Sequence, residues 1–381
     1  MGAMKIGSGL LVVTMAVGLL TACGRGQAPN VMNTVSNNTV SNTQGTDAGA
    51  VNVEDEAQTA GFEVLAEKLE TPWAIDFIGD TIYISERAGK IVKVDSGKQT
   101  RQNVKLSKAV RAGGEGGLLG FALAPDFQTS KQAYVYHTYE ENGKLYNRIV
   151  LIREDDQGTG WSEMRELLGS IPGAQNHNGG RLLLGPDGML YATTGDAQEE
   201  ASSQDRSALA GKILRLKPDG SIPADNPLPD SYVYSYGHRN PQGLAWSKAG
   251  QLYSSEHGPS GAPGGHDELN IIQAGSNYGW PDIIGDEKKE GMVTPLYHTG
   301  ESTLAPSGIA IADNGDILVT GLRGQSLVRF SPDASKQETL VTSEGRLRDV
   351  KIKDGAIYVI TNNTDGRGEP GNTDDRLLRL K

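Results

Sequence analysis

The sequence predicts an all-β fold, a six-bladed β-propeller, on three observations. Glycine is frequent, with 50 among 381 residues, which is about 13% against roughly 7% in average proteins and favours many tight turns. Short apolar stretches alternate along the chain with turns rich in Asp, Asn and Gly, and no long amphipathic helical pattern lies between them. This arrangement is typical of short strands joined by tight turns.

The repeating element is a hairpin with period-2 alternation on both sides of its turn. The first copy joins residues 73–77 to 81–85. The later copies join 119–122 to 133–136 across a longer turn, 181–184 to 189–193, 243–246 to 251–255, 308–311 to 316–320, and 349–352 to 356–360. Six hairpins about 40 to 65 residues apart match the period of propeller blades. The alternative is an irregular β-sandwich with insertions, which predicts fewer equivalent hairpins.

The N-terminus has the layout of a secretory signal. Lys5 precedes an apolar run at 10–20, which leads into Leu20-Thr21-Ala22-Cys23, with small residues before the cleavage point. Residues 1–22 are therefore expected to be a lipoprotein signal peptide, because the run is too short for a stable membrane span. Lipidation of Cys23 would anchor the mature protein outside the cytoplasm on the cell membrane. The alternative is an uncleaved or soluble secreted N-terminus with a buried cysteine.

The next segment, 23–60, is predicted to be a flexible tether. It consists mainly of Asn, Ser, Thr, Gly and Ala, so it cannot bury enough apolar surface to offset the entropy of ordering. The propeller domain is expected to occupy 61–381. The formal net charge of −11 and the lack of a long Lys/Arg run exclude nucleic acid as a partner. The single cysteine excludes an internal disulfide framework and a cysteine-rich zinc site.

The most informative segment is Asn176-His177-Asn178-Gly179-Gly180-Arg181-Leu182, followed by Thr193-Thr194-Gly195-Asp196. A histidine in a glycine-rich approach to a strand is a candidate general base, since its pKa is near neutral. Asp196 ends the second strand of the same hairpin and could orient that imidazole. A lone histidine is more often structural, but the flanking glycines and the following Gly-Asp favour function here.

Two later segments carry further polar groups. In Tyr236-Gly237-His238-Arg239-Asn240-Pro241-Gln242-Gly243, Arg239 can bind carboxylates and Asn240 can bridge an oxygen, although strand-edge arginines are commonly just solvated. The other segment contains Glu256-His257-Gly258-Pro259, Gly265-His266-Asp267-Glu268-Leu269-Asn270 and Asn277-Tyr278-Gly279-Trp280-Pro281. Carbonyls at Gly-Pro and clustered carboxylates are the oxygen ligands that Ca²⁺ prefers. An acidic loop with no bound ion is the alternative.

These motifs, taken in order, resemble the glucose/sorbosone dehydrogenase family, which includes soluble PQQ (pyrroloquinoline quinone) glucose dehydrogenase and the aldose sugar dehydrogenases. The resemblance rests on the three segments above together with Ala305-Pro306-Ser307-Gly308 and Arg346-Leu347-Arg348-Asp349-Val350. It extends from about residue 62 to the C-terminus. A single string of this kind would be weak evidence, but the ordered set is specific.

The resemblance implies a PQQ- and Ca²⁺-dependent oxidation of aldoses at C1. His177 matches the family's general base, which takes the proton of the C1 hydroxyl as hydride passes to the quinone, and Asp196 matches the carboxylate that holds this histidine. Arg239 and Asn240 match residues that contact PQQ, with the arginine near the quinone oxygens. The identity of the electron acceptor is not implied.

The resemblance also implies the remaining ligands of the cofactor and the metal. Arg346 and Arg348 match arginines on the PQQ carboxylates, and Arg323 stands where the glucose dehydrogenases have a lysine that contacts the cofactor. Gly258 and Pro259 match carbonyl donors to the calcium that polarises PQQ. Asp267, Glu268 and Tyr278 resemble a neighbouring structural calcium region.

The sequence departs from the glucose dehydrogenases at two places. Glu115, in Gly114-Glu115-Gly116-Gly117, replaces a glutamine that contacts substrate, which indicates the aldose branch. The stretch 298–304 lacks the tryptophan that packs near the cofactor. Either His298 or another group then covers the quinone, or cofactor binding is weakened or lost.

Two other function classes stay open at this point. One is a Ca²⁺-dependent lactonase or related hydrolase, because six-bladed propellers also support such chemistry and fold does not determine function. The other is a non-catalytic surface lipoprotein that binds sugar. The arginines favour an anionic cofactor, and therefore the dehydrogenase, over both alternatives. The missing tryptophan favours the non-catalytic sugar-binding lipoprotein.

Overall fold

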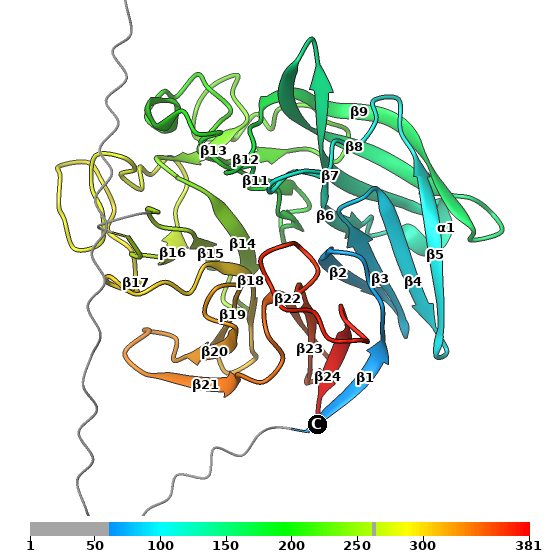
Figure 1. Ribbon diagram of the computed structural model, residues 1–381. Helices are drawn as coiled ribbons and strands as arrows, with labels where there is room; N and C mark the ends of the chain where they lie inside the picture. The colour runs from blue at the N-terminus through cyan, green and yellow to red at the C-terminus, as the bar shows by residue number, and fades with distance from the viewer. Residues whose placement is uncertain (1–60, 261–263) are drawn as a thin grey trace, which may run out of the picture. The chain divides into compact units, whose positions relative to one another are not determined.

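The computed structural model describes residues 61–260 and 264–381, so the expected signal peptide, Cys23 and the tether lie outside the described residues. The described chain is built from four four-stranded antiparallel sheets and one eight-stranded sheet. A short parallel pairing of β5 with β9 divides the eight-stranded sheet into two four-stranded units. Each unit is one blade, and the prediction of a six-bladed β-propeller is confirmed (Figure 1).

The first three blades follow one another along the chain. Blade 1 contains β2 (Pro72–Ile78), β3 (Thr81–Glu86), β4 (Lys90–Asp95) and β5 (Lys98–Lys105). Blade 2 contains β6 (Leu118–Leu123), the short helix α1 (Phe127–Ser130), β7 (Gln132–Glu141), β8 (Lys144–Glu154) and β9 (Gly160–Pro172). Blade 3 contains β10 (Leu182–Leu184), β11 (Leu190–Thr194), the 3₁₀ turn η1 (Glu200–Ser203), β12 (Lys212–Leu216) and β13 (Val233–Tyr236).

The last three blades complete the ring. Blade 4 contains β14 (Pro241–Trp246), β15 (Leu252–Glu256), β16 (Glu268–Ile272) and β17 (Tyr297–His298). Blade 5 contains β18 (Pro306–Ile311), β19 (Ile317–Gly321), β20 (Ser326–Phe330) and β21 (Gln337–Val341). Blade 6 contains β22 (Leu347–Lys353), β23 (Ala356–Thr361) and β24 (Leu377–Leu380), and its outer strand is β1 (Phe62–Ala66). Pairing of β1 with β24 joins the two ends of the domain and closes the ring.

The six predicted hairpins correspond to the first two strands of the six blades. The first strands β2, β6, β10, β14, β18 and β22 contact one another in a closed ring and so form the hub. Apolar residues between neighbouring blades form the core, for example Ile75, Ile82 and Ile360 between blades 1 and 6. Among the described residues, no helix is long and apolar enough to cross a bilayer.

The recurring glycines of the first strands have a packing reason. Gly120, Gly243 and Gly308 each begin a Gly-x-Ala step. A Cβ at Gly243 would lie 2.4 Å from the carbonyl oxygen of Ser307, and a Cβ at Gly308 would lie 2.1 Å from an oxygen of Asp349. Glycine is therefore required where neighbouring first strands approach closely.

A buried ion pair crosses the hub. Arg181, which precedes β10, lies 3.0 Å from the carboxylate of Asp349 in β22, and both side chains are almost fully buried. The same guanidinium donates to the carbonyl of Gln242 in β14 and lies over the ring of Trp73 in β2. Four blades thus meet at Arg181.

Candidate active site

The blade topology gathers the functional segments at one end of the hub. In every blade the start of the first strand pairs with the end of the second strand, as Pro241 pairs with Glu256 and Leu347 with Thr361. Residues that precede a first strand and residues that follow a second strand therefore share one end of the propeller. His177, Asn240 and Arg346 belong to the first kind.

His177 and Asp196 form a close pair at this end. Nδ1 of His177 lies 2.7 Å from Oδ1 of Asp196, and the aspartate is fully buried while the imidazole is 17% exposed. Within the described residues, no hydrogen bond is formed by Nε2 of His177, so this nitrogen is available for proton transfer. The backbone approaches tightly here, because a Cβ at Gly195 would lie 2.0 Å from the carbonyl oxygen of His177.

Trp280 completes the environment of Asp196. Its indole N–H donates to Oδ2 of Asp196 at 2.9 Å, so both carboxylate oxygens have partners. The guanidinium of Arg239 lies over the Trp280 ring, 5.2 Å from its centroid. Asp196 also receives the N–H of Gln198 at 2.8 Å. The carboxylate is held on several sides, which fixes the orientation of the imidazole.

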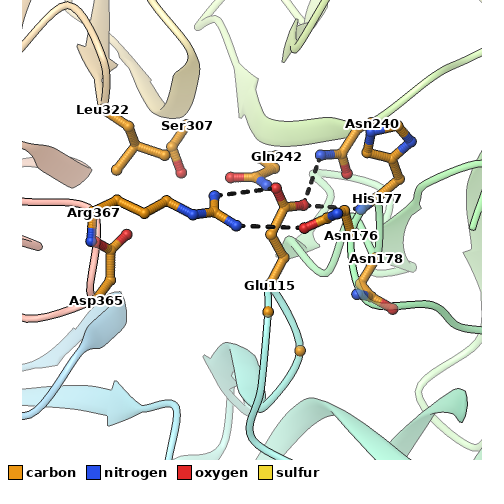
Figure 2. Close-up of polar contacts among 12 residues, drawn as sticks. Glu115, Asn176, His177, Asn178, Asn240, Gln242, Ser307, Leu322, Asp365 and Arg367 are labelled. Carbon is orange, nitrogen blue, oxygen red and sulfur yellow. Dashed lines mark hydrogen bonds and ion pairs between the residues drawn. The ribbon is translucent and has the colours of Figure 1, made fainter. Parts of the chain in front are cut away.

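Glu115, which precedes blade 2, contacts the backbone of His177, which precedes the neighbouring blade 3 (Figure 2). Its Oε2 accepts the N–H of His177 at 2.9 Å and the Nδ2 amide of Asn240 at 3.2 Å, and its Oε1 lies 3.4 Å from Nη1 of Arg367. Burial alone would raise the pKa of the Glu115 carboxyl. The charge of His257, the His177 N–H and Arg367 outweigh burial and lower this pKa to about 2. Because burial lowers the pKa of His257 itself, the His177 N–H and Arg367 are the contributions that persist at neutral pH.

Glu256 organises the turn that carries Arg239 and Asn240. Its buried carboxylate accepts the backbone N–H groups of both residues and lies 2.9 Å from Nδ1 of His238. The Arg239 side chain is buried, donates to the carbonyl of His257 and keeps its Nε without a partner among the described residues. Burial lowers the pKa of Arg239. A buried, incompletely bonded guanidinium is suited to an anionic ligand.

Blade 6 adds further buried arginines. Arg346 pairs with Asp365 at 2.9 Å, and Arg348 donates to Asn362 and Gln242. Burial lowers the pKa of Arg348 to about 9, and the positive charges of Arg87 and Arg346 act in the same direction. Several buried guanidinium groups therefore lie at this end of the hub, and the carboxylates of Asp365 and Glu115 act on them from nearby.

Arg323 is the one expected cofactor residue whose side chain stands apart. It lies in the turn after β19, where its side chain is exposed. Arg346 contacts the preceding residue by donating to the carbonyl of Leu322. Among the described residues, the Arg323 guanidinium forms no hydrogen bond or ion pair, although the neighbouring Leu322 contacts Arg346.

The expected metal residues divide into two groups. Within residues 61–260 and 264–381, no donor approaches the carbonyl oxygens of Gly258 and Pro259. Both residues and Glu268 line a cavity of about 10 Å³, which is the size of one water or ion. Burial and the nearby Glu256 carboxylate raise the pKa of Glu268 to about 8. Arg239, Trp280, Ile283 and Ile284 line the same space, so the oxygen-bearing residues occupy only part of its wall.

Asp267 and Tyr278 have their polar atoms engaged. The Asp267 carboxylate accepts the N–H of Gly258 and three donors from Thr303, Leu304 and Ala305. The Tyr278 hydroxyl donates to the carbonyl of Ile271 and accepts the N–H of Gln273. Their side chains shape the loops, and no described group of three His, Cys, Asp or Glu side chains is close enough to hold a metal.

Comparison with known proteins decides the family. The sequence model of the Glucose / Sorbosone dehydrogenase family matches residues 69–379. The chain belongs to this family. The resemblance read from the motifs is confirmed, and with it the expectation of an oxidoreductase.

Two relatives and one solved structure illustrate the similarity. The aldose sugar dehydrogenase of Escherichia coli is 32% identical over 346 residues, 81% of this chain and 91% of that protein. The quinoprotein glucose dehydrogenase B of Acinetobacter calcoaceticus is 34% identical over 294 residues, 67% of this chain and 61% of that protein. The PQQ-bound aldose sugar dehydrogenase of Streptomyces coelicolor is 39% identical, with a TM-score of 0.77 over 84% of this chain and 96% of that one.

The aromatic residue beside the His177 and Asp196 pair is Trp280. His298 lies in β17, the outermost strand of blade 4, where it stacks on His266 and lies 3.3 Å from Asp286. Trp280 belongs to the Asn277-Tyr278-Gly279-Trp280-Pro281 motif, for which the sequence suggests metal binding only. Its role at Asp196 was missed because the bond joins segments 84 residues apart.

Sequence reasoning also missed Arg367 and Gln242. Arg367 lies in the long loop between β23 and β24, outside every quoted motif. Gln242 lies in a quoted motif, but its role as acceptor for Arg348 depends on a contact over 106 residues. No local pattern marks either contact.

Proposed function

We propose that this member of the glucose/sorbosone dehydrogenase family is a quinoprotein aldose dehydrogenase that uses PQQ and Ca²⁺ to oxidise aldoses at C1 to the lactone. The observation that carries the proposal is the His177 and Asp196 pair, held at 2.7 Å at the same end of the hub as the buried arginines. A general base beside a cluster of cations suits oxidation of a hydroxyl with an anionic cofactor. The names of the relatives support the same reaction class.

The residues of the hub fit an anionic cofactor. Three buried nitrogen atoms have no partner among the described residues: Nε of Arg239, Nε of Arg346 and Nε2 of His257. Burial and the neighbouring arginines also lower the pKa of Arg348. Carboxylates placed among these groups would satisfy the donors and balance the charge. Arg239, Asn240, Arg346 and Arg348 would hold PQQ, and the exposed Arg323 would be a further contact. When bound, PQQ supplies the two-electron acceptor.

The chain's own residues carry out the proton transfer. His177 Nε2 takes the proton of the C1 hydroxyl, while C1 loses its hydrogen together with two electrons, and the cyclic sugar becomes the lactone. Asp196 stabilises the imidazolium that results, because its charge lies 2.7 Å from Nδ1. Asp196 itself keeps its orientation through Trp280. Base and orienting carboxylate thus work as one unit.

The calcium assignment rests on the carbonyls of Gly258 and Pro259, with Glu268 as the neighbouring carboxylate. Hard oxygen donors around a small space match the preference of Ca²⁺. A bound cation would also favour the ionised form of Glu268, whose pKa is raised in its absence. Asp267 would act on the metal indirectly by holding the N–H of Gly258.

Reconstitution tests the proposal. Metal-free, cofactor-free protein supplied with PQQ and Ca²⁺ is expected to reduce an artificial dye when given aldoses, and omission of PQQ should abolish the reaction. His177→Ala should lower kcat by a factor of about 10² to 10⁴ while PQQ still binds, as calorimetric titration would show. Full activity of His177→Ala would eliminate the assigned base.

The same assay separates the alternatives. A Ca²⁺-dependent lactonase would hydrolyse lactones without PQQ, and a non-catalytic sugar-binding protein would show neither activity. The family assignment and the buried arginines favour the redox reaction over both. The lipid anchor at Cys23 and the extracytoplasmic location belong to the proposal as well.

A further inference from the structure

The two oxygens of the Glu115 carboxylate are bound very unequally. Oε2 accepts a backbone N–H from His177 at 2.9 Å and an amide from Asn240 at 3.2 Å, both from well-ordered interior segments. Within the described part of the chain, the one partner of Oε1 is the guanidinium of Arg367, at 3.4 Å. One oxygen is therefore held by the segments that carry His177 and Asn240, and the other points toward the guanidinium of Arg367 (Figure 2).

The contact made by Arg367 is weak for an ion pair. Both of its side-chain contacts, to Glu115 and to Asn176, measure 3.4 Å, against about 2.7 to 2.9 Å for a good charge-assisted hydrogen bond. The Arg367 side chain is 47% exposed, whereas Glu115 is 16% exposed. Solvent screens such a pair, so little free energy opposes its opening.

The backbone that carries Arg367 is fixed. Asp365 accepts the N–H of Arg367 at 2.9 Å with one oxygen and the guanidinium of Arg346 at 2.9 Å with the other. Gly368 packs so closely on Arg346 that an added Cβ would lie 2.8 Å from Cδ of that side chain. Movement at this position is therefore confined to the Arg367 side chain.

A second position for the Arg367 guanidinium is available next to the hub. Arg367 also lines a polar cavity of about 340 Å³ between blades 5 and 6. Carboxylates of Glu344, Glu369 and Asp374 line the same cavity. Glu344 and Asp374 already pair with Arg376, which also lines the cavity, so Glu369 is the carboxylate that Arg367 could approach in place of Glu115.

We propose that Arg367 is a specificity-determining residue that caps Oε1 of Glu115 and yields this oxygen to a hydroxyl of the incoming aldose. The inference rests on the proposed function. While it caps Oε1, the guanidinium of Arg367 offsets the charge of Glu115, so the site favours neutral aldoses. Without Arg367, an ionised carboxylate would face the substrate alone and would attract an aldose that carries an ammonium group.

Competition between glucose and protonated glucosamine tests the proposal. In the reconstituted enzyme at low salt, Arg367→Ala should raise the ratio of kcat/KM for glucosamine to kcat/KM for glucose about tenfold, since one nearby charge is removed. Added salt should reduce this gain. Arg367→Lys keeps the charge and should stay within about twofold of the wild type. Glu115→Gln, combined with Arg367→Ala, should reverse the gain.

Arg111→Ala is the matched control. Arg111 is an exposed arginine in the segment before β6 and pairs with Glu140, so its removal changes the net charge equally but leaves the cap intact. The sugar ratio should not change in this variant. An unchanged ratio in Arg367→Ala, or an equal rise in Arg111→Ala, would overturn the proposal.

A binding measurement keeps this inference separate from the proposed function. Methyl glycosides of glucose and glucosamine cannot be oxidised at C1 and can be followed by ligand-observed NMR on the cofactor-free protein. Arg367→Ala should strengthen binding of the glucosaminide relative to the glucoside. If no sugar is oxidised with PQQ, the proposed function fails, and this binding ratio still decides the role of Arg367. An unaltered binding ratio there would count against the cap.

Discussion

Trp280 donates its indole N–H to Oδ2 of Asp196 at 2.9 Å, across 84 residues of sequence. The other oxygen of this carboxylate lies 2.7 Å from Nδ1 of His177. The tryptophan therefore sets the plane of the group that orients the base, and its ring also lies beneath Arg239. One side chain connects the proton-transfer pair to the expected cofactor site.

Trp280→Phe is expected to lower kcat about tenfold with little change in the KM for sugar. The phenyl ring keeps the contact with Arg239, but Asp196 loses a buried hydrogen bond, a loss of about 1 to 3 kcal/mol. Steady-state kinetics with the reconstituted enzyme measures this. Trp246→Phe is a control, because the Trp246 indole N–H has no partner among the described residues. Equal losses in the two variants would contradict the role given to Trp280.

Asp267→Asn should weaken calcium binding without removing any metal ligand. The carboxylate receives four donors, including the N–H of Gly258 and two backbone N–H groups at Leu304 and Ala305. An amide cannot accept all of them, so the loop with the Gly258 and Pro259 carbonyls should shift. We expect the thermal midpoint to fall and the Kd for Ca²⁺ to rise at least tenfold by calorimetry. Unaltered calcium affinity would exclude this indirect role.

Calcium removal should also change the pH dependence of stability at Glu268. Burial raises the pKa of this carboxyl to about 8, so the folded protein holds a proton that the unfolded chain releases near pH 4.5. Metal-free protein should therefore lose stability as pH rises from about 4.5 to 8. Glu268→Gln should lessen this decline in denaturation experiments, whereas an equal decline in the variant would argue against it.

Glu115 should change the pH dependence of stability in the opposite direction to Glu268. The pKa of this group falls from 4.5 to about 2 on folding, with burial outweighed by the charge of His257, the His177 N–H and Arg367. The stabilisation is present above about pH 4.5 and is lost as pH falls toward 2. Over that window the wild type should lose on the order of 3 kcal/mol more than Glu115→Gln. Glu290→Gln, an exposed site, controls for the added amide.

Cys23→Ser should release the protein from the membrane. Lipidation needs the thiol, and a single substitution before the propeller domain should leave folding of 61–381 unaffected. Fractionation of cells expressing both forms, with labelling by a radioactive fatty acid, measures the effect. Retention of the serine variant in the membrane fraction, or absence of label in the wild type, would refute the anchor.

The fold was accessible from sequence because its signals are local. Alternation of polar and apolar residues over four to six positions marks a strand wherever it occurs, and Gly or Asp marks the turn that follows. The hairpin at 73–85 illustrates this, since β2 and β3 lie where the pattern indicated. The parallel β5 and β9 contact and the closure by β1 had no comparable local signal.

The site was only partly accessible. The sequence alone pointed to His177 and Asp196 as the proposed base and its carboxylate, and the order of motifs determined the family. Only the tertiary structure showed that Asp267 and Tyr278 hydrogen-bond to backbone groups. It also showed that the Arg323 side chain is exposed. It brought Arg367 into contact with Glu115, which lies 252 residues away in the sequence. The physical reason is that each side chain can form only a few hydrogen bonds. Its partners come from the neighbouring blades, and the closed ring determines which blades are neighbours.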